Sequence, residues 1–555
     1  MKKYWPWFAL LFAAYILLLF YGIDYPVWNK DEGLYADTVR EMIERGNYLD
    51  PYFNYEHRWQ KPILIYWVLL PFAELFGSSG WSLRLGLIVV GLLTLWITWL
   101  WALRLFRSRE VAFFSAFFLV STAAFIIQTR HIVTHLLLLF TIMLSFYFLW
   151  ELLRGPRRRR TVLLFGASVG LAFLAKLYVG VVFILTAGFL LGFTEIWRHR
   201  KAFFKEALWG VLAFSVVALP WYLYMIAHYG DAYLNFLYHE FFDRIGRSYT
   251  GNKGPFFYVG VYFGNFAPWS VLLAAMGAAS LWRYRLQSWN LLRENRALLL
   301  VLTGFFVVFV TLSIPKSKLP GYLFSLQGFA AVLTAYGFVS LEWNRGWKVL
   351  FLGLQILLGV ATLAVWFLYF DWKSLQFALV AVLLIVSFIW PMIDKYRAVL
   401  RVGVVGFLLF FSIVGNLYKE ISPYFAYERF GEKVASIRQK TPLPVYTYRM
   451  ERLSLPFYTR TKVRSIRDLP QDRDYLLMID VDKFDALSQK PKYYRILDRA
   501  LYYKGADSQV FKIINMAKGY RSREKEGEWI LLRVSDRPFP PDGASETARQ
   551  SSKER

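Results

Sequence analysis

The 555-residue sequence contains no cysteine, which excludes disulfide bonds, thiolate metal sites and cysteine nucleophiles. It is also poor in charge. Only 19% of its residues are charged and 57% are hydrophobic, against about 45–50% in soluble proteins. A chain of this composition cannot be a string of soluble domains, so most of it must lie in lipid.

Acidic residues are scarce as well, with 39 of them against 65 basic residues and a net charge of +26. A surplus of this size can indicate a nucleic-acid partner. Here the basic residues gather in short runs between apolar stretches, as they do in the cytoplasmic loops of membrane proteins. The sequence therefore predicts an α-helical polytopic membrane protein that contacts membrane lipid and binds no nucleic acid.

The first apolar run, Trp5 to Ile23, is long enough to cross a bilayer, and no small-residue cleavage motif follows it. We expect a retained span. With it, the following apolar runs predict thirteen spans: 81–103, 110–128, 132–153, 161–177, 179–196, 203–226, 258–282, 297–314, 319–342, 347–370, 374–393 and 398–418. Basic clusters follow the even-numbered spans, which predicts a cytoplasmic N-terminus and an external C-terminus.

Two long polar regions then face the outside, the loop 24–62 and the tail from residue 419. In the tail, the runs Val445–Tyr448, Tyr475–Val481 and Trp529–Val534 predict strands, and Ala426–Arg438 predicts a helix. The organisation expected is a membrane domain over 1–418, a small extracytoplasmic α/β domain over 419–536 and a disordered tail over 537–555.

Residues 29–46 in the external loop have the apolar spacing of an amphipathic helix at the membrane surface. Asp31 and Glu32 stand at its start. One interpretation is structural, with Asn29 capping the helix and Glu32 closing a capping box. The other is catalytic, with Asp31 held ionised by the helix amides and acting as a general base.

Basic side chains outside the membrane are candidates for binding a phosphate. Arg58 and Lys61 either anchor the loop to lipid head groups or hold a substrate phosphate. Lys316 and Lys318 lie between spans nine and ten, on the outside. Because they run against the positive-inside trend, topology alone does not explain them, and they are candidates for binding an anion.

Two histidines, His131 and His135, are four residues apart, so we expect them to share one helix face near the outer end of the fourth span. With His239 and Glu240 they could form a zinc site. Alternatively, histidines at an interfacial helix end need only water or a neighbouring carboxylate. No cofactor is certain from the sequence.

A series of short motifs resembles the lipid A aminoarabinose transferases and related bacterial protein-mannosyltransferase-like enzymes. In chain order they are Asp31-Glu32, Tyr35-Ala36, Arg40-Glu41-Met42, Gly46, Pro51, Asn54, Lys61-Pro62, Tyr66-Trp67, residues 81–85, Thr129-Arg130, residues 170–176, Pro220-Trp221-Tyr222, Gly254-Pro255, Pro268-Trp269-Ser270 and residues 317–322. The resemblance covers nearly the whole membrane part.

The resemblance implies an integral-membrane glycosyltransferase of the GT-C class in a bacterial inner membrane. Such an enzyme passes a sugar from a polyprenyl phosphate to an acceptor outside the cytoplasm, here lipid A or another glycolipid or glycan. The expected phosphate-binding residues are Arg58, Lys61, Lys176, Arg244, Lys316 and Lys318, and those expected to line the cavity are Tyr35, Arg84, Arg130 and Tyr322.

Three positions depart from the family pattern. His135 stands where members usually have Asp, Gln60 stands where they often have Glu, and Leu177-Tyr178 replaces Gly-Pro after Lys176. We therefore expect Asp31, with Glu32 secondary, to be the catalytic acid pair, with His135 as a further catalytic residue.

The reaction expected is a single displacement with inversion, in which basic residues stabilise the leaving phosphate. A pyrophosphate-linked donor would suit the same residues. Two other classes of function stay open: a polytopic transporter or lipid flippase, and a scaffold that has lost activity because His135 replaces the acid. Few ionisable residues lie at mid-depth in the predicted spans, which argues against transport.

Overall fold

The computed structural model describes residues 2–27, 30–154, 158–198, 200–246, 253–284, 295–315, 317–370, 374–417, 427–450, 453–471, 473–503 and 526–539. The chain forms two compact units. The first, the membrane unit, comprises residues 1–25, 38–51 and 57–419, and the second comprises 26–37, 52–56 and 420–555. Each unit is described by itself.

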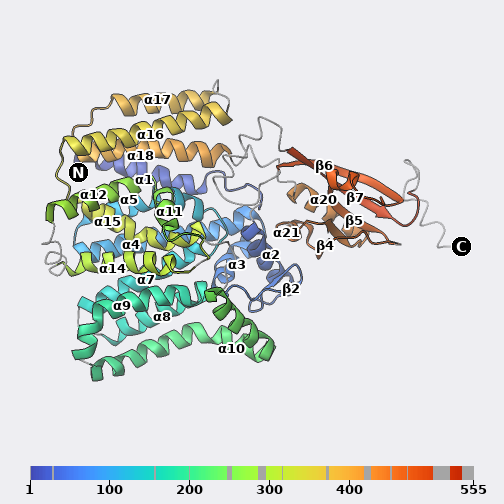
Figure 1. Cartoon of the computed structure of the whole chain (residues 1–555), viewed down its shortest axis with the longest axis horizontal. Coiled ribbons are helices and arrows are strands. Elements are labelled where there is room, and N and C mark those ends of the chain that lie inside the picture. The colour runs from blue at the N-terminus through green and yellow to red at the C-terminus, as the bar shows by residue number, and fades with distance from the viewer. Residues whose placement is uncertain are drawn as a thin grey trace. The chain divides into compact units, whose positions relative to one another are not determined.

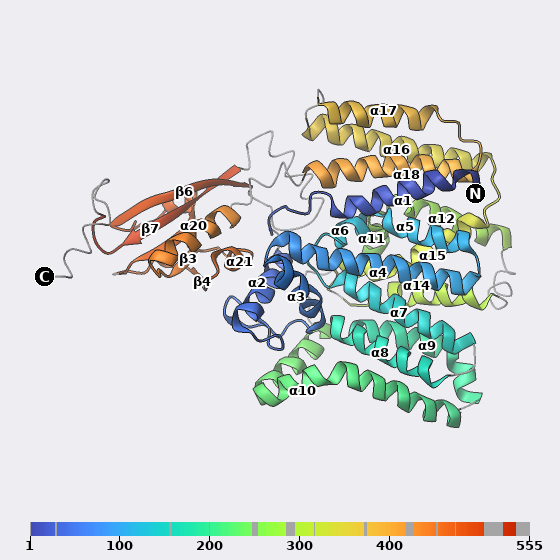
Figure 2. The same ribbon diagram turned by 180° about the vertical axis from the view of Figure 1, so that it is seen from behind.

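The membrane unit is helical (Figures 1 and 2). Its main helices are α1 (Trp5–Phe20), α3 (Leu64–Phe76), α4 (Gly80–Phe106), α5 (Arg109–Val120), α6 (Ala123–Gln128), α7 (His135–Arg154), α8 (Arg159–Lys176), α9 (Tyr178–Arg198), α10 (Arg200–Gly246), α11 (Phe257–Asn265), α12 (Ser270–Tyr284), α14 (Arg296–Ser313), α15 (Gln327–Val339), α16 (Arg345–Tyr369), α17 (Leu375–Ile389) and α18 (Lys395–Phe410). Shorter turns are η1 (Lys2–Tyr4), η3 (Pro320–Leu326) and the π-helical η4 (Phe411–Leu417).

Among the described residues, 8 helices are long and apolar enough to span a membrane, or 9 if the bent pair α11 and α12 counts as one span. Three shorter apolar helices accompany them: Leu64–Phe76, Tyr178–Gly192 and Leu375–Ile389. The predicted class, a polytopic helical membrane protein, is confirmed. The predicted number of thirteen spans is not.

Two of the predicted spans are broken helices. The run 110–128 divides into α5 and α6, because Thr122 caps a new helix by accepting a hydrogen bond from the amide of Phe125. The run 258–282 divides into α11 and α12, which meet at 116°. Pro268 lies at this second break and lacks the amide hydrogen that a continuous helix needs.

Helices α7 and α8 pack against each other, and the turn η3 packs against α7. Helix α7 begins at His135 and α8 ends at Lys176. The start of one helix, the end of its neighbour and the turn η3 therefore come together, which positions the side chains described below.

The second unit contains a five-stranded mixed sheet with the strand order β4-β3-β5-β7-β6. Its strands are β3 (Val445–Tyr448), β4 (Val463–Ile466), β5 (Tyr475–Asp480), β6 (Tyr493–Tyr503) and β7 (Glu526–Ser535). Strand β3 is parallel to β4 and β5, whereas β7 is antiparallel to β5 and β6. The described part of the tail also contains three helices: α20 (Tyr427–Lys440), α21 (Leu455–Thr459) and α22 (Val481–Asp485).

The predicted α/β tail is therefore confirmed, with its three strands and its helix close to the expected positions. Strands β4 and β6 were not predicted. Alternate residues of β3, β5 and β7 form an apolar core on one face of the sheet, together with Phe484 of α22. Residues 540–555, most of the predicted disordered tail, lie outside the described residues.

The second unit also takes in two pieces of the loop 24–62, so the division of the chain differs there from the predicted boundary. One piece includes the first part of α2 (Lys30–Arg45), and the other is most of the hairpin formed by β1 (Tyr52–Phe53) and β2 (Glu56–His57). Asn54 and Tyr55 form the hairpin turn with φ of 53° and 63°, the left-handed conformation that two-residue turns require.

Candidate active site

Four of the residues predicted for the site come together in the membrane unit. The ammonium Nζ of Lys176 lies 3.2 Å from Nδ1 of His135 and 4.3 Å from the centre of the Tyr322 ring. The rings of His135 and Tyr322 are 5.8 Å apart. Lys61 also acts electrostatically on His135. We call Lys61, His135, Lys176 and Tyr322 the basic cluster.

The hydrogen bond between Lys176 and His135 assigns the tautomer of the ring. An ammonium group can only donate, so Nδ1 accepts and the proton of the neutral ring lies on Nε2. Nε2 faces Gly321, where an added Cβ would approach it to 2.9 Å. Glycine at this position therefore leaves room for the histidine ring.

The other basic residues predicted to bind phosphate are not all described. Lys318 is buried and its Nζ donates to the carbonyl of Lys253 at 3.2 Å. Arg58 is also buried, and its amide donates to the carbonyl of Pro51 at 2.8 Å. Lys316 lies outside the described residues, and Arg244 lies on α10 where side chains are not described.

Arg84 and Arg130 form hydrogen bonds to the backbone that the sequence did not predict. Both are fully buried, and their guanidinium groups donate to backbone carbonyls between Leu18 and Tyr25, just beyond and within the last turn of α1. The Arg84 guanidinium also lies 3.5 Å from the centre of the Tyr25 ring, and the Tyr25 hydroxyl donates to the carbonyl of Arg130 at 2.6 Å. The carbonyl of Leu18 is one of those that a helix end leaves without partners, and the other accepting carbonyls lie in the segment that follows α1. A role of the two arginines in the cavity stays a prediction.

The acidic pair lies on the first turn of α2 and belongs to the second unit. The Asp31 side chain is exposed, whereas Glu32 is fully buried and Tyr35 is nearly so. Asn29, the expected helix cap, lies outside the described residues, so the capping interpretation of Asp31 and Glu32 stays open.

The two histidines of the predicted zinc site, His131 and His135, are not arranged as expected. Helix α7 begins at His135, so His131 lies in the turn before it and the two histidines do not share a helix face. His239 is exposed on α10 and is followed by Glu240. Within the described ranges, no three His, Cys, Asp or Glu residues lie close enough to hold a metal ion. Zinc dependence stays a prediction.

A polar and aromatic group on the membrane unit was missed by sequence reasoning. The buried carboxylate of Asp50 accepts a hydrogen bond from the Tyr229 hydroxyl of α10, and its other oxygen lies 3.7 Å from Nδ1 of His57. The His57 ring stacks on Trp59 at 5.3 Å, and Trp59 contacts Tyr229 in turn. These contacts fasten Asp50, His57 and Trp59 to α10 within the membrane unit. Asp50 and His57 are seven residues apart, so no short motif marks the pair.

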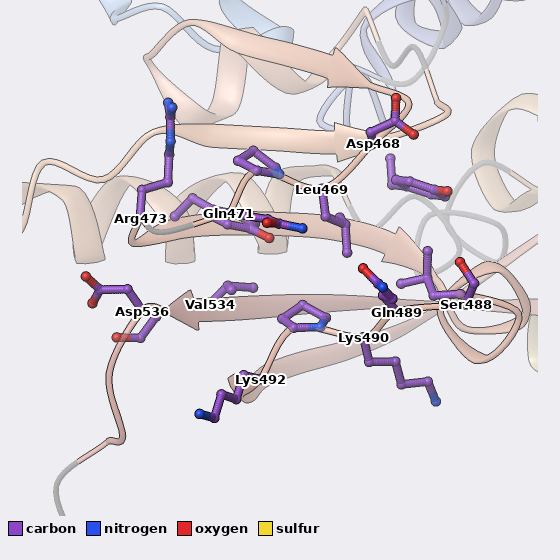
Figure 3. Close-up of a pocket in the computed structure, with 16 residues that line it drawn as sticks. Asp468, Leu469, Gln471, Arg473, Ser488, Gln489, Lys490, Lys492, Val534 and Asp536 are labelled. Carbon is purple, nitrogen blue, oxygen red and sulfur yellow. The ribbon is translucent and has the colours of Figure 1, made fainter.

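The second unit has a cavity of about 440 Å³ on the core face of its sheet (Figure 3). Its wall is formed by the connection from β4 to β5, with Leu469 and Gln471, and by the connection from α22 to β6, with Gln489 and Lys490. None of the predicted site residues lines this cavity. We do not assign it to the active site.

Comparison with known proteins gives the family context. Residues 6–235 match the family model described as dolichyl-phosphate-mannose-protein mannosyltransferase. A protein from Aquifex aeolicus is 27% identical over 474 residues, which is 84% of this chain and 89% of that protein. The undecaprenyl phosphate-alpha-4-amino-4-deoxy-L-arabinose arabinosyl transferase of Erwinia tasmaniensis is 30% identical over 352 residues. That alignment covers 59% of each protein, so the chain matches about three fifths of the length of this relative.

The fold is that of a solved enzyme. The crystal structure of ArnT from Cupriavidus metallidurans bound to undecaprenyl phosphate matches with a TM-score of 0.71 and 19% identity, over 94% of this chain and 97% of that one. The chain therefore has the fold of this solved enzyme. In sequence it is similar to the mannosyltransferase family model over residues 6–235 and to the arabinosyl transferases named above, as the loop motifs predicted.

Proposed function

We propose that the chain transfers a sugar from a polyprenyl phosphate of the undecaprenyl type to an acceptor outside the cytoplasm. The observation that carries this proposal is the basic cluster at the ends of α7 and α8, where two lysines act on one neutral histidine. Cations in a partly dry site suit a phosphate leaving group. The relatives named for undecaprenyl-phosphate-linked arabinose support this choice of donor.

The reaction is a displacement at the anomeric carbon. An acceptor oxygen attacks from the face opposite the phosphate, the bond from the anomeric carbon to the phosphate oxygen breaks, and its electron pair stays on that oxygen. Lys61 and Lys176 stabilise the charge that develops there. The acceptor's hydroxyl proton passes to the exposed carboxylate of Asp31, whereas an acceptor that is itself a phosphate needs no base.

His135 orients a cation in this scheme. Its Nδ1 accepts a hydrogen bond from Lys176, which restrains an otherwise flexible ammonium group beside Tyr322. The carboxylate that the family usually has at this position could accept the same bond. The scaffold without activity is therefore the weaker alternative, because the substitution keeps a hydrogen-bond acceptor for Lys176.

A direct assay tests this function. The full-length protein, reconstituted in lipid nanodiscs, is given a radiolabelled undecaprenyl-phosphate-linked sugar, and the loss of label from the lipid is followed. Activity should depend on Lys176 and not on Lys348, an exposed lysine near the start of α16, so Lys348→Ala is the matched control. Equal activity of Lys176→Ala and Lys348→Ala would contradict the proposal.

We propose lipid A, or another glycolipid or glycan, as the acceptor. Mass spectrometry of lipids from cells that lack the protein should show one species without its sugar. Re-expression of the wild-type chain should restore that species. Asp31→Asn should fail to restore it if the acceptor is a hydroxyl, and should restore it if the acceptor is a phosphate, which needs no base. An unchanged lipid profile in the deletion would exclude a lipid acceptor.

The proposed orientation has the N-terminus in the cytoplasm of a bacterial inner membrane and the loop and tail outside. Because the chain has no cysteine, single cysteines can be introduced one at a time. An impermeant maleimide should label positions 47 and 460 in intact cells and leave position 158 unlabelled. Labelling at 158 alone would show the opposite orientation.

A further inference from the structure

Within the second unit, one short stretch of the tail contacts every piece of the external loop that belongs to this unit. This stretch runs from residue 453 to 463 and includes α21 and the first residue of β4; we call it the clamp segment. The amide of Val27 donates to the Tyr458 hydroxyl, α2 packs on the clamp segment at Gly33, and the hairpin binds it through Asn54. These contacts join parts of the chain about 400 residues apart.

Asn54 makes the most specific of these contacts. Its side-chain Nδ2 donates to the carbonyl of Val463 at 2.8 Å, and its Oδ1 accepts from the amide of Val463 at 2.8 Å. Val463 starts β4, an edge strand of the sheet, so the Asn54 amide acts there as a short substitute for a neighbouring strand. The backbone amide of Asn54 donates to the buried carboxylate of Asp37 on α2 at 2.9 Å. One residue thus joins the hairpin, α2 and the sheet.

Gly33 brings α2 directly against the clamp segment. A Cβ at this position would lie 2.6 Å from the carbonyl oxygen of Leu453 and 2.6 Å from atoms of Ser454. Part of this contact is backbone, which cannot rotate away as a flexible side chain would. Gly33 directly follows Asp31 and Glu32. We call this first turn of α2 the acidic turn, and through Gly33 it lies in van der Waals contact with the tail.

Two further contacts are weaker. The Tyr55 hydroxyl donates to the carbonyl of Arg460 at 3.1 Å, and Lys462 pairs with Glu56 at 2.9 Å. Both bonds are exposed, so each contributes little. They serve as internal controls for Asn54 and Gly33.

We propose that Asn54 and Gly33 are positioning residues, through which the clamp segment of the C-terminal unit holds the acidic turn of α2 in place for the reaction. This inference rests on the proposed function, in which Asp31 receives the acceptor proton. The tail then has a task in catalysis although it supplies no reacting group. Donor binding depends on the basic cluster and is independent of this contact.

The sharpest variant is Asn54→Gly, because glycine adopts the left-handed turn and removes only the side-chain amide. Loss of the two hydrogen bonds should lower kcat about tenfold with the KM for the donor unchanged. Gly33→Ala should act in the same direction, and Tyr55→Phe should change kcat less than twofold. Asn344→Gly, which removes a helix-capping asparagine from α16, is the matched control and should leave kcat unchanged.

Two further measurements separate positioning from simple damage to the fold. In Asn54→Gly, hydrogen exchange of the full-length protein in nanodiscs should quicken in both residues 30–37 and 453–463, and not in α7 or α8. Adding Asn54→Gly to Asp31→Asn should lower kcat no further, because Asn54 acts through Asp31.

The outcomes distinguish this inference from the proposed function. Wild-type turnover in Asp31→Asn would overturn the proposed role of Asp31 as the base, on which this inference rests, and would leave the proposed sugar transfer standing. Coupled exchange in the two segments would still support the structural contact. The inference is overturned if Asn54→Gly leaves both kcat and the exchange of 453–463 unchanged. It is also overturned if Asn54→Gly raises the donor KM with kcat unchanged.

Discussion

The basic cluster and the acidic turn are held in opposite ways. Lys176 and His135 stand at the ends of packed membrane helices and contact each other through side chains. Asp31 and Glu32 stand on the first turn of a helix that is fastened, through backbone and amide contacts, to an α/β fold formed by the distant C-terminal tail. The two charges that the proposed reaction needs therefore depend on different parts of the chain.

This difference teaches that binding and turnover should respond separately to mutation. The proposed phosphate site requires only that the membrane helices be in place. The proposed base also requires the tail, because Gly33 and Asn54 contact the clamp segment. Changes in the tail should thus alter turnover before they alter donor affinity.

The largest loss of turnover should come from substitution of Asp31. Asp31→Asn keeps the size of the side chain and removes the proposed base, and a positioned base contributes roughly 10²–10⁴-fold in rate. Turnover should fall by that factor while donor affinity stays within twofold. Steady-state kinetics with labelled donor checks this, with Glu44→Gln at the exposed end of the same helix as the control. A similar loss in Glu44→Gln would point to disruption of α2 instead.

A smaller effect should come from the basic cluster. Lys176→Ala removes the proposed charged contact to the phosphate, and loss of one such contact costs roughly 1.5–3 kcal/mol or about 10- to 150-fold in donor affinity. Equilibrium binding of undecaprenyl phosphate to the reconstituted protein measures this change. If Lys176→Ala lowers turnover and keeps full affinity, the cation acts on the transition state alone and the separation between the two regions is wrong.

Arg130 should affect stability and not binding. Arg130→Met removes the donor to the buried Leu18 carbonyl in the last turn of α1, at about 1–3 kcal/mol, and also the donor to the part-buried carbonyl of Gly22. The melting temperature of the purified protein should fall while donor affinity is kept. Arg283→Ala removes an exposed ion pair with Glu342 and should leave the melting temperature unchanged. If Arg130→Met keeps the melting temperature and loses affinity for the donor, the prediction that Arg130 lines the substrate cavity would be supported instead.

The sequence predicted the class of fold and much of the tail because both depend on local pattern. Apolar runs and β-branched stretches show spans and strands directly, and the helix and three strands of the tail lie where expected. Broken spans were missed because Thr122 and Pro268 lie inside continuous apolar runs. Hydropathy averages over such breaks.

The site was only partly accessible from the sequence. The motifs predicted Lys61, His135, Lys176 and Tyr322, and three of these four are in direct contact. The contacts of Asn54 with Val463 could not be predicted, because they join residues 409 positions apart and leave no spacing pattern. The spacing of His131 and His135 predicted a shared helix face that the structure does not have. Residues four apart share a face only when both are helical, and α7 begins at His135.

The smallest effect should come from His135. His135→Gln keeps a hydrogen-bond acceptor for Lys176 and does not titrate, so turnover near neutral pH should change only a few-fold. The wild-type protein should lose activity on acidification as the ring takes up a second proton and can no longer accept from Lys176, and His135→Gln should lack that loss. The two pH profiles of turnover check this. Identical profiles would leave His135 without an electrostatic part in the reaction.

The most direct test of the whole account is a single-turnover experiment on the reconstituted protein, in which donor binding and sugar transfer are measured in the same sample. The account predicts that Asp31→Asn binds the undecaprenyl-phosphate-linked donor as the wild type does and transfers its sugar slowly. It predicts that Lys176→Ala binds the donor weakly. Equal loss of binding in both variants, with both proteins folded, would contradict the proposed separation of donor binding by Lys176 from proton transfer to Asp31.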